Sequence, residues 1–163
     1  MHGRTIIVGV VFRGSLWLDG VLTSNLDATL RSYNSEISRA IESSKQYRQL
    51  HAVILSRRLS RSRKISVLDL ARRLKLPVIA SAKSADGSRP GRRLRAVKNF
   101  GICVSGKRLE VSAAGVDEVE AERLYGIGCT QGSMLPEAVR VADLLTKQLC
   151  CGPANPNENV KIC

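Results

Sequence analysis

The first part of the chain has the hydrophobic pattern of a β-hairpin. Thr5 to Arg13 is a run of mostly apolar residues, and a second such run extends from Leu16 to Leu22. The residues between the two runs include Gly14, and a short connection that contains glycine is typical of a tight turn. The pattern therefore predicts an antiparallel hairpin at the start of the chain.

The residues after the hairpin follow a helical period. Apolar side chains recur every three or four positions, at Leu26, Leu30, Tyr33, Ile37 and Ile41. This spacing predicts a helix with one apolar face. Ser24, Asn25 or Asp27 would cap its first turn, since each carries a side-chain oxygen that can accept a backbone hydrogen bond.

A strand, a basic loop, a helix and a second strand follow in βαβ order. Ala52 to Leu55 is a short apolar run, as expected of a central strand that is covered on both faces. The basic loop extends from Ser56 to Lys64. The helix after it has one apolar face, formed by Val67, Leu70, Ala71 and Leu74. Pro77 to Ala80 returns as a strand, and this order predicts parallel pairing of the two strands.

The next segment predicts a basic helix and a second hairpin. Pro90 and Gly101 are typical of the two ends of a helix. The inward side chains of that helix would be Leu94, Val97 and Phe100. Ile102 to Val104 and Leu109 to Ala113 then alternate around a glycine-containing turn, which predicts a hairpin.

Two helices complete the predicted order. Asp117 and Glu120 have the spacing of a capping box and predict an acidic helix that ends at Tyr125. Pro136 predicts the start of a longer helix that ends at Leu149. Most of the circumference of this last helix is apolar, so we expect it to pack under the sheet.

Composition indicates one globular domain. The chain has 163 residues, of which 44% are hydrophobic and 4% aromatic, and this length allows a core that needs neither disulfides nor a structural metal. We predict a single domain over residues 1–152 and a flexible polar tail over residues 153–163. The longest apolar run is too short to cross a bilayer, and the first residues lack the pattern of a secretory signal. These features predict a cytoplasmic protein whose five cysteines are reduced.

Positive charge is concentrated in one segment. The chain has 26 basic and 14 acidic residues, which gives a formal net charge of +12. Fourteen of the basic residues and two of the acidic ones lie between Ser56 and Lys98, so the rest of the chain is neutral. Such a field attracts polyanions, of which nucleic acid is the commonest inside cells, although a solubilising surface would have the same charge.

Three acidic residues are candidates for a metal-dependent site, and each has a structural alternative. Asp27 stands at the start of the first predicted helix, and Asp69 completes the capping-box pattern of Ser66–Asp69. Glu137 would lie in a first helical turn, where the helix dipole stabilises it. A metal-dependent nuclease requires several carboxylates that converge, whereas Ser56-Arg57-Arg58 follows the strand where such ligands are expected.

Neither the cysteines nor the aromatic residues predict a site. The glycine-rich stretch Tyr125–Gly132 lacks the spacing of a nucleotide-binding loop, and Cys129 has no histidine near it in the sequence. The aromatic residues are scattered, so core packing explains them better than a base-stacking platform does. These aromatic residues are Trp17, Tyr33, Tyr47 and Phe100.

Several short blocks together resemble the endonuclease dU family, which is related in fold to endonuclease V. The blocks are Val8–Gly14, Asp19–Leu22, Asp27–Thr29, Val53–Leu55, Val67–Leu70, Leu76–Ile79 and Gly132–Ala142. The last block is the most specific of them, because Gly, Pro, Glu and Arg occur in it in the order typical of the family. The resemblance extends over about residues 5–150.

The resemblance implies a fold and an activity. The implied fold is α/β and RNase H-like (endonuclease V-like), a mixed sheet with helices on both faces and an amino-terminal antiparallel hairpin. The implied activity is cleavage of DNA at deaminated bases such as deoxyuridine, with Mg²⁺ or Mn²⁺ as the cofactor. Asp27, Asp69 and Glu137 match the family pattern and would be the catalytic residues. However, the chain begins at what would be the second strand of the family, and Ser56-Arg57 stands where Asp-Gly is usual.

These departures favour a nucleic-acid-binding protein with impaired catalysis. Serine ligates Mg²⁺ weakly and arginine repels it, so no resident metal is expected. The phosphates of DNA or RNA would instead contact Arg57, Arg58, Arg61, Arg63 and Lys64, with Arg92, Arg93, Arg95 and Lys98 nearby. An active endonuclease with Mg²⁺ or Mn²⁺ and a module that binds an acidic protein stay open as alternatives. No membrane contact is expected, and the sequence leaves the oligomeric state open.

Overall fold

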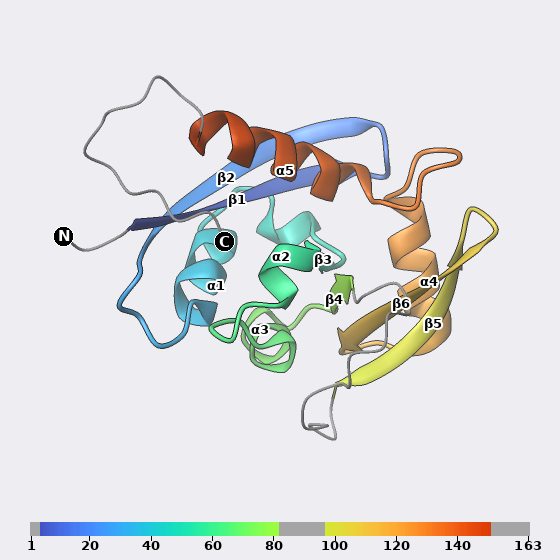
Figure 1. The fold of residues 1–163 in the computed structure, drawn as a ribbon, viewed down its shortest axis with the longest axis horizontal. Coiled ribbons are helices and arrows are strands. Elements are labelled where there is room, and N and C mark those ends of the chain that lie inside the picture. Colours follow the sequence, from blue (N-terminus) through green and yellow to red (C-terminus); the bar gives the residue numbers. More distant parts are fainter. Residues whose placement is uncertain (1–3, 82–96, 151–163) are drawn as a thin grey trace.

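The strands of the protein form two separate sheets. The computed structural model describes residues 4–81 and 97–150. The first sheet is the antiparallel hairpin of β1 (Arg4–Arg13) and β2 (Trp17–Asp27), and the second has the order β3-β4-β6-β5. Figure 1 shows the hairpin along the top of the view and β5 and β6 at the right, with β3 and β4 in the middle. The predicted mixed α/β fold with an amino-terminal hairpin is confirmed.

The hairpin is longer than predicted, and the helix after it begins later. Leu26 is buried and pairs with Thr5 near the end of β2, whereas the sequence period suggested that it begins a helix. The Asp27 carboxylate then accepts a hydrogen bond of 2.8 Å from the Thr29 amide, which turns the chain. Helix α1 (Asn34–Glu42) therefore contains only the last part of the predicted helix.

The parallel strand pair is confirmed, but the place of its first strand in the sheet differs from the prediction. β3 (Val53–Leu55) pairs in parallel with β4 (Val78–Ser81). β3 is the edge strand of its sheet rather than a central one, because β1 pairs with β2 and forms no ladder with β3. The predicted basic loop after β3 begins with a short helix, α2 (Arg57–Ser60), and α3 (Val67–Leu74) follows as predicted.

The second hairpin replaces part of the predicted basic helix. β5 (Lys98–Val104) pairs with β6 (Lys107–Ala114), and the ladder extends back to Lys98. The residues up to Phe100 are therefore extended where the sequence predicted a helical end. Ser105 and Gly106 both have a positive φ, which is the requirement of a tight two-residue turn. The start of the predicted helix, with Pro90 and Leu94, lies outside the described residues.

The caps predicted for two helices are confirmed. The Ser66 hydroxyl accepts a hydrogen bond from the Asp69 amide at the start of α3. The Asp117 carboxylate accepts one from the Glu120 amide at the start of α4 (Glu118–Ile127). Each bond satisfies an amide that the helix itself leaves without a partner.

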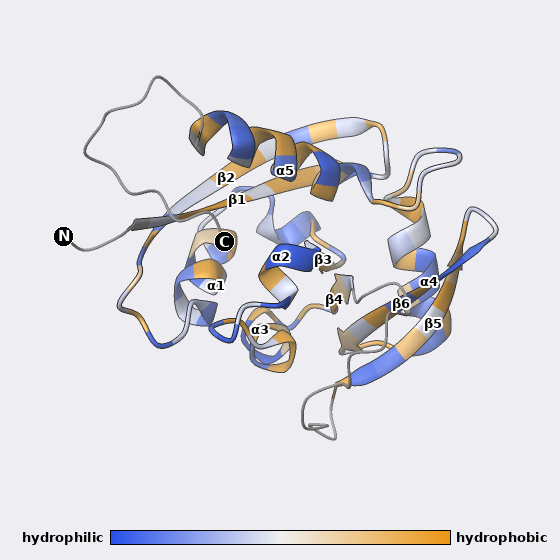
Figure 2. Ribbon diagram, viewed as in Figure 1, coloured by the Kyte–Doolittle hydropathy of each residue, from blue (hydrophilic) through white to orange (hydrophobic). Residues whose placement is uncertain are grey.

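The core consists of two apolar clusters, one on each side of the β3–β4 pair. The first joins Leu26, Leu70 and Val78, and the second joins Ile79, Ile102 and Tyr125 with their neighbours. Figure 2 shows apolar residues along much of β1 and hydrophilic residues in α2.

Helix α5 (Glu137–Cys150) packs along β1 but is less buried than predicted. Leu144 and Leu149 are 46% and 52% exposed, because α5 lies across one sheet and is not enclosed by a second layer. No helix within residues 4–81 and 97–150 is long and apolar enough to cross a membrane.

Candidate nucleic-acid interface

A groove lies between β1, β3 and α5 and encloses a cavity of about 140 Å³. We refer to it as the β1–β3 groove. Five consecutive residues of β1, Ile6–Val10, form one wall, and Ile54 of β3 lies in the other. Apolar side chains from two helices close it, namely Leu59, Ala138, Val139 and Ala142. Most of the residues that line the groove are therefore apolar.

One set of groove residues is polar, and it includes the residue that follows β3. Ser56 comes directly after Leu55, the last residue of the strand. Arg58 of α2 and three residues of α5 complete this set, which we refer to as the polar end: Ser56, Arg58, Asp143, Thr146 and Lys147. The α5 residues reach the groove together because positions 139, 142, 143, 146 and 147 share one helix face.

Asp143 is the one carboxylate in the polar end, and it was not among the predicted site residues. A sequence signal for it exists, because Asp143 lies on the same helix face as the apolar residues Val139 and Ala142. An acid on the inward face of an amphipathic helix is unusual and indicates a polar site. The prediction missed it because the helix was assessed as a packing element alone.

The donor set of the polar end does not fit a divalent cation. Mg²⁺ and Mn²⁺ require several oxygen ligands, of which carboxylates contribute most of the charge. Here a single carboxylate stands with two cationic side chains, Arg58 and Lys147. The Ser56 hydroxyl is already used as the cap of α2, where it accepts a hydrogen bond of 3.4 Å from the Leu59 amide.

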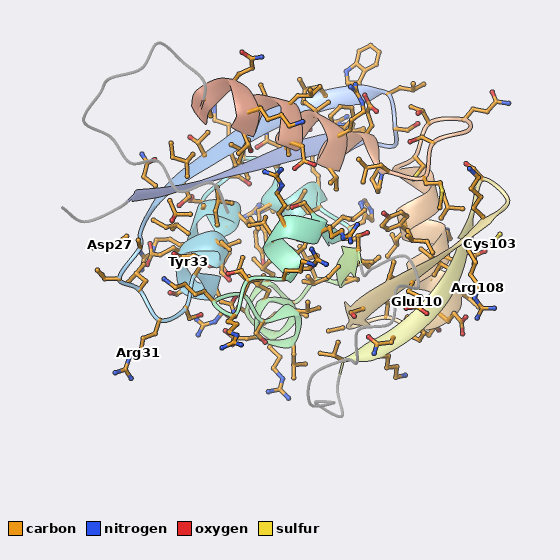
Figure 3. All side chains as sticks on the ribbon, viewed as in Figure 1. Asp27, Arg31, Tyr33, Cys103, Arg108 and Glu110 are labelled. Atoms are coloured by element: carbon orange, nitrogen blue, oxygen red, sulfur yellow. The ribbon has the colours of Figure 1, made fainter. Side chains whose placement is uncertain are left out.

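The three acidic residues proposed from the sequence have separate environments. Asp27 lies at the end of β2, on one side of the molecule in Figure 3, and its carboxylate also accepts a hydrogen bond from the Thr29 hydroxyl. Glu137 forms an ion pair with Arg140 one turn later on α5, and the hydrogen bond from this guanidinium lowers the pKa of the glutamate.

Asp69 forms a local network at the start of α3. Its carboxylate accepts a hydrogen bond of 2.8 Å from Asn34 Nδ2 and one of 3.0 Å from Arg73 Nε. The hydrogen bond from Asn34 is the main reason why the pKa of Asp69 lies below its ordinary value. Within the ranges 4–81 and 97–150, no group of three His, Cys, Asp or Glu side chains is placed to hold a metal ion.

The basic side chains after β3 divide into two kinds. Four arginines on and after α2 are exposed, namely Arg57, Arg58, Arg61 and Arg63. Lys64 is different, because its ammonium group donates to the Ala28 carbonyl and the Tyr33 hydroxyl and lies 4.8 Å from the centre of the Tyr33 ring. Lys64 therefore stabilises the fold.

The second basic group of the prediction is only partly described. Lys98 is exposed at the start of β5, so it belongs to a strand and not to the predicted helix. Arg92, Arg93 and Arg95 lie outside the described residues.

The prediction that aromatic side chains pack in the core is correct for Tyr33 and Tyr47 and wrong for Trp17. Tyr33 is buried, and the Tyr47 hydroxyl donates to the Leu74 carbonyl. Trp17, by contrast, is 71% exposed at the start of β2, with the exposed side chains of Leu16 and Leu18 beside it. The sequence predicted that Trp17 packs in the core, but the side chain lies at the exposed tip of the hairpin.

The sequence is similar to that of one family of proteins. A sequence model that describes the endonuclease dU family matches residues 1–150. A UPF0215 protein of Methanothermobacter thermautotrophicus is 27% identical, over 90% of this chain and 79% of the relative. A UPF0215 protein of Methanosarcina acetivorans is 26% identical, over 93% of this chain and 86% of the relative.

Two solved structures share the fold. A protein of unknown function from Archaeoglobus fulgidus superposes with a TM-score of 0.67 at 16% identity, over 92% of this chain and 99% of the other. Endonuclease V of Bacillus subtilis superposes with a TM-score of 0.50 at 15% identity, over 91% of this chain and 81% of the other. At these identities the similarity establishes the architecture, and the chemistry has to be argued from the residues.

Proposed function

Because the chain belongs to the endonuclease dU family, we propose that it binds the phosphate backbone of DNA or RNA and that its cleavage activity is impaired. The observation that carries this proposal is the charge of the polar end, which contains two cations, Arg58 and Lys147, and a single carboxylate, Asp143. Two cations attract a phosphodiester, whereas one carboxylate is too little for the metal-assisted hydrolysis that the family name implies.

The four exposed arginines after β3 would supply most of the binding energy. Five other arginines of the described part form ion pairs with carboxylates, which neutralise them: Arg13, Arg39, Arg73, Arg123 and Arg140. No such ion pair within the described ranges involves Arg57, Arg58, Arg61 or Arg63. A guanidinium group that is not neutralised binds phosphate oxygens through two parallel hydrogen bonds, without reading the base sequence.

Salt dependence of binding tests the proposal. Affinity for a fluorescent DNA duplex is expected to fall steeply with salt, with a logarithmic slope of about −0.9 for each phosphate contacted. Replacement of the four arginines after β3 by alanine is expected to flatten the slope by about three to four contacts. A matched control removes four exposed cations from other parts of the surface and should change the slope less: Arg31, Arg48, Lys107 and Arg108.

Two outcomes of the binding measurements and one outcome of a cleavage assay would contradict the proposal. One is the absence of binding to duplex DNA, single-stranded DNA and RNA at low salt, and another is an equal loss of slope in both variants. The third is nicking of a deoxyuridine-containing duplex by the wild type with Mg²⁺ or Mn²⁺, abolished by Asp27→Asn, which would establish the active endonuclease instead. Preference for that duplex without nicking would support binding and would connect it with DNA repair.

The remaining alternative is an acidic protein as the partner of the basic surface. Capture of such a protein that survives nuclease treatment, together with a lack of affinity for nucleic acid, would favour it over the proposal.

A further inference from the structure

Two serines of the chain follow basic residues with the same spacing. Ser60 follows Arg57-Arg58-Leu59, and Ser66 follows Arg63-Lys64-Ile65. In both cases the cations stand two and three residues before the hydroxyl group. Protein kinases that select basic substrates recognise cations at these two positions through acidic residues of their own. The spacing therefore indicates two candidate acceptors of a phosphoryl group, and the structure distinguishes between them.

The fold already uses the groups that a kinase would need at Ser66. The ammonium group of Lys64 donates to the Tyr33 hydroxyl and is held against the protein. Ile65 is buried, and the Ser66 hydroxyl caps α3 by accepting a hydrogen bond from the Asp69 amide. Ser66 is therefore not available as an acceptor in the folded protein.

Ser60 lies on a short surface element. It is the last residue of α2, which is a single helical turn, and Arg57 and Arg58 on the same turn are both exposed. A helix of one turn has little stability of its own, so it unwinds at low cost. The Ser60 hydroxyl donates to the Arg57 carbonyl over 3.0 Å and to the Ser81 carbonyl of β4 over 3.2 Å. Both hydrogen bonds have to open before the hydroxyl reacts.

The charges around Ser60 suit a phosphate group. Arg57 precedes Ser60 by one helical turn, Arg61 follows it directly, and Arg58 and Arg63 lie within three residues of it. In the part of the chain that the structure describes, none of these arginines forms an ion pair with a carboxylate. A phosphoserine carries a charge of about −1.5 to −2 and three strong acceptor oxygens. It would therefore bind guanidinium groups that have no anionic partner in the unmodified protein.

We propose that Ser60 is a phosphorylation site and that its phosphate group weakens the binding of nucleic acid. In the reaction, Ser60 Oγ forms a bond to the γ-phosphorus of ATP and the bond from that phosphorus to the bridging oxygen breaks, so that ADP leaves. The proton of the hydroxyl passes to the general base of the kinase. The phosphate then occupies arginines that the proposed function assigns to nucleic acid, so the effect on binding rests on that function.

Phosphorylation of the intact chain tests the site. The probe is the catalytic subunit of cAMP-dependent protein kinase, which selects arginines at these two positions, together with ATP, and phosphopeptide mass spectrometry maps the product. We expect one phosphate, on Ser60, and none in Ser60→Ala. Ser66→Asn keeps a residue that caps α3 and should be modified like the wild type. A phosphate on Ser66 in place of Ser60, or no incorporation into the folded protein, would overturn the proposal.

Salt titrations with a fluorescent DNA duplex test the effect on binding. The phosphorylated protein should lose about two phosphate contacts from its salt slope and bind at least about tenfold more weakly than the unmodified protein. Ser60→Glu should lower the slope by about one contact. Ser60→Gln is the matched control, because it loses the same two hydrogen bonds without a gain of charge, and it should bind like the wild type. Thermal unfolding checks that each protein is folded.

The outcomes separate this proposal from the proposed function. Equal slopes for the phosphorylated and unmodified proteins would overturn it, as would equal effects of Ser60→Glu and Ser60→Gln. Lack of binding by the unmodified protein would instead contradict the proposed function, and a phosphate mapped to Ser60 would still support the modification site.

Discussion

Asn34 Nδ2 donates a hydrogen bond of 2.8 Å to the Asp69 carboxylate, and this contact joins the start of α1 to the start of α3. The Asn34 side-chain oxygen accepts a second hydrogen bond from the Ser66 amide. Asn34 is 2% exposed, so water has little access to the Asn34 end of either hydrogen bond. A single amide side chain thus connects two elements that are far apart in the sequence.

This network predicts that Asp69 stabilises the fold above acid pH. The hydrogen bond from Asn34 lowers the pKa of Asp69 below its ordinary value in the folded protein. A carboxyl group of this kind contributes stability above its unfolded pKa and loses it as the pH falls through the folded pKa. Urea unfolding of the wild type and of Asp69→Asn should therefore show the two free energies converging below about pH 4. The difference should be small, since the Asp69 side chain is 42% exposed. A constant difference across this pH range would contradict the assignment.

Removal of Asn34 should cost more than removal of the charge that it contacts. Asn34→Ala leaves the Asp69 carboxylate and the half-buried Ser66 amide without this partner, and the expected loss is about 1–3 kcal/mol of unfolding free energy. Ser35→Ala, at the exposed neighbouring position, is the control and should change stability by less than about 0.5 kcal/mol. Equal effects of the two changes on chemical denaturation would show that the network is not stabilising.

Substitution of Lys64 should lower stability and leave nucleic-acid binding almost unchanged, whereas substitution of Arg61 should weaken binding and leave stability unchanged. Lys64→Ala removes two hydrogen bonds and the contact with the Tyr33 ring, so its melting temperature should fall while the salt slope of nucleic-acid binding changes little. Arg61→Ala should lower the slope by about one phosphate contact and leave the melting temperature unchanged. Paired calorimetry and anisotropy titrations measure both quantities. A large change in the salt slope of Lys64→Ala would show that Lys64 contributes to nucleic-acid binding.

Cys103 and Cys129 should differ sharply in reactivity. Burial raises the pKa of Cys129 to about 11, so at pH 8 almost none of it is the reactive thiolate. Cys103 is exposed on β5. Iodoacetamide at pH 8 should label Cys103 at least about tenfold faster than Cys129, as mapped by peptide mass spectrometry. Rapid labelling of Cys129 would indicate that the cluster around Tyr125 opens readily.

Local sequence signals predicted the elements that are defined by neighbouring residues. The hairpin turn at Ser105 and Gly106, the Ser66 and Asp117 caps and the parallel β3–β4 pair each depend on a few residues in sequence order. The start of α1 was misplaced because Leu26 satisfies a helical period and a strand pairing equally well. Only the pairing of Leu26 with Thr5, a tertiary contact, decides between them.

The candidate site could not be predicted from the sequence alone, because the fold brings its residues together. Asp27, Asp69 and Glu137 looked equivalent as acids near helix starts, yet separate hydrogen-bond partners hold them. Asp143 was not predicted as a site residue, because only the packing of α5 against β1 places its side chain in the lining of the groove. The same holds for Trp17, whose exposure depends on where the covering layer ends.

The final prediction concerns a variant whose polar end has two carboxylates and one cation. Ser56→Asp combined with Arg58→Ala adds a second carboxylate to the groove that already contains Asp143 and removes one of its cations. Aspartate caps helices as well as serine does, so α2 should keep its cap and the fold should be preserved. Ser56→Asn with Arg58→Ala is the matched control, since asparagine also caps but brings no charge.

Two carboxylates attract a divalent cation much more strongly than one carboxylate beside an arginine, because both the ligand count and the local potential change. The aspartate variant should therefore bind Mn²⁺, measured as the loss of the free-ion signal in electron paramagnetic resonance, and Asp143→Asn in the same background should remove this binding. The wild type and the asparagine control should bind it at least about tenfold more weakly. Equal binding by all three proteins would show that Ser56 and Arg58 do not determine metal affinity. Binding by the aspartate variant that persists after Asp143→Asn would show that Asp143 does not share the site.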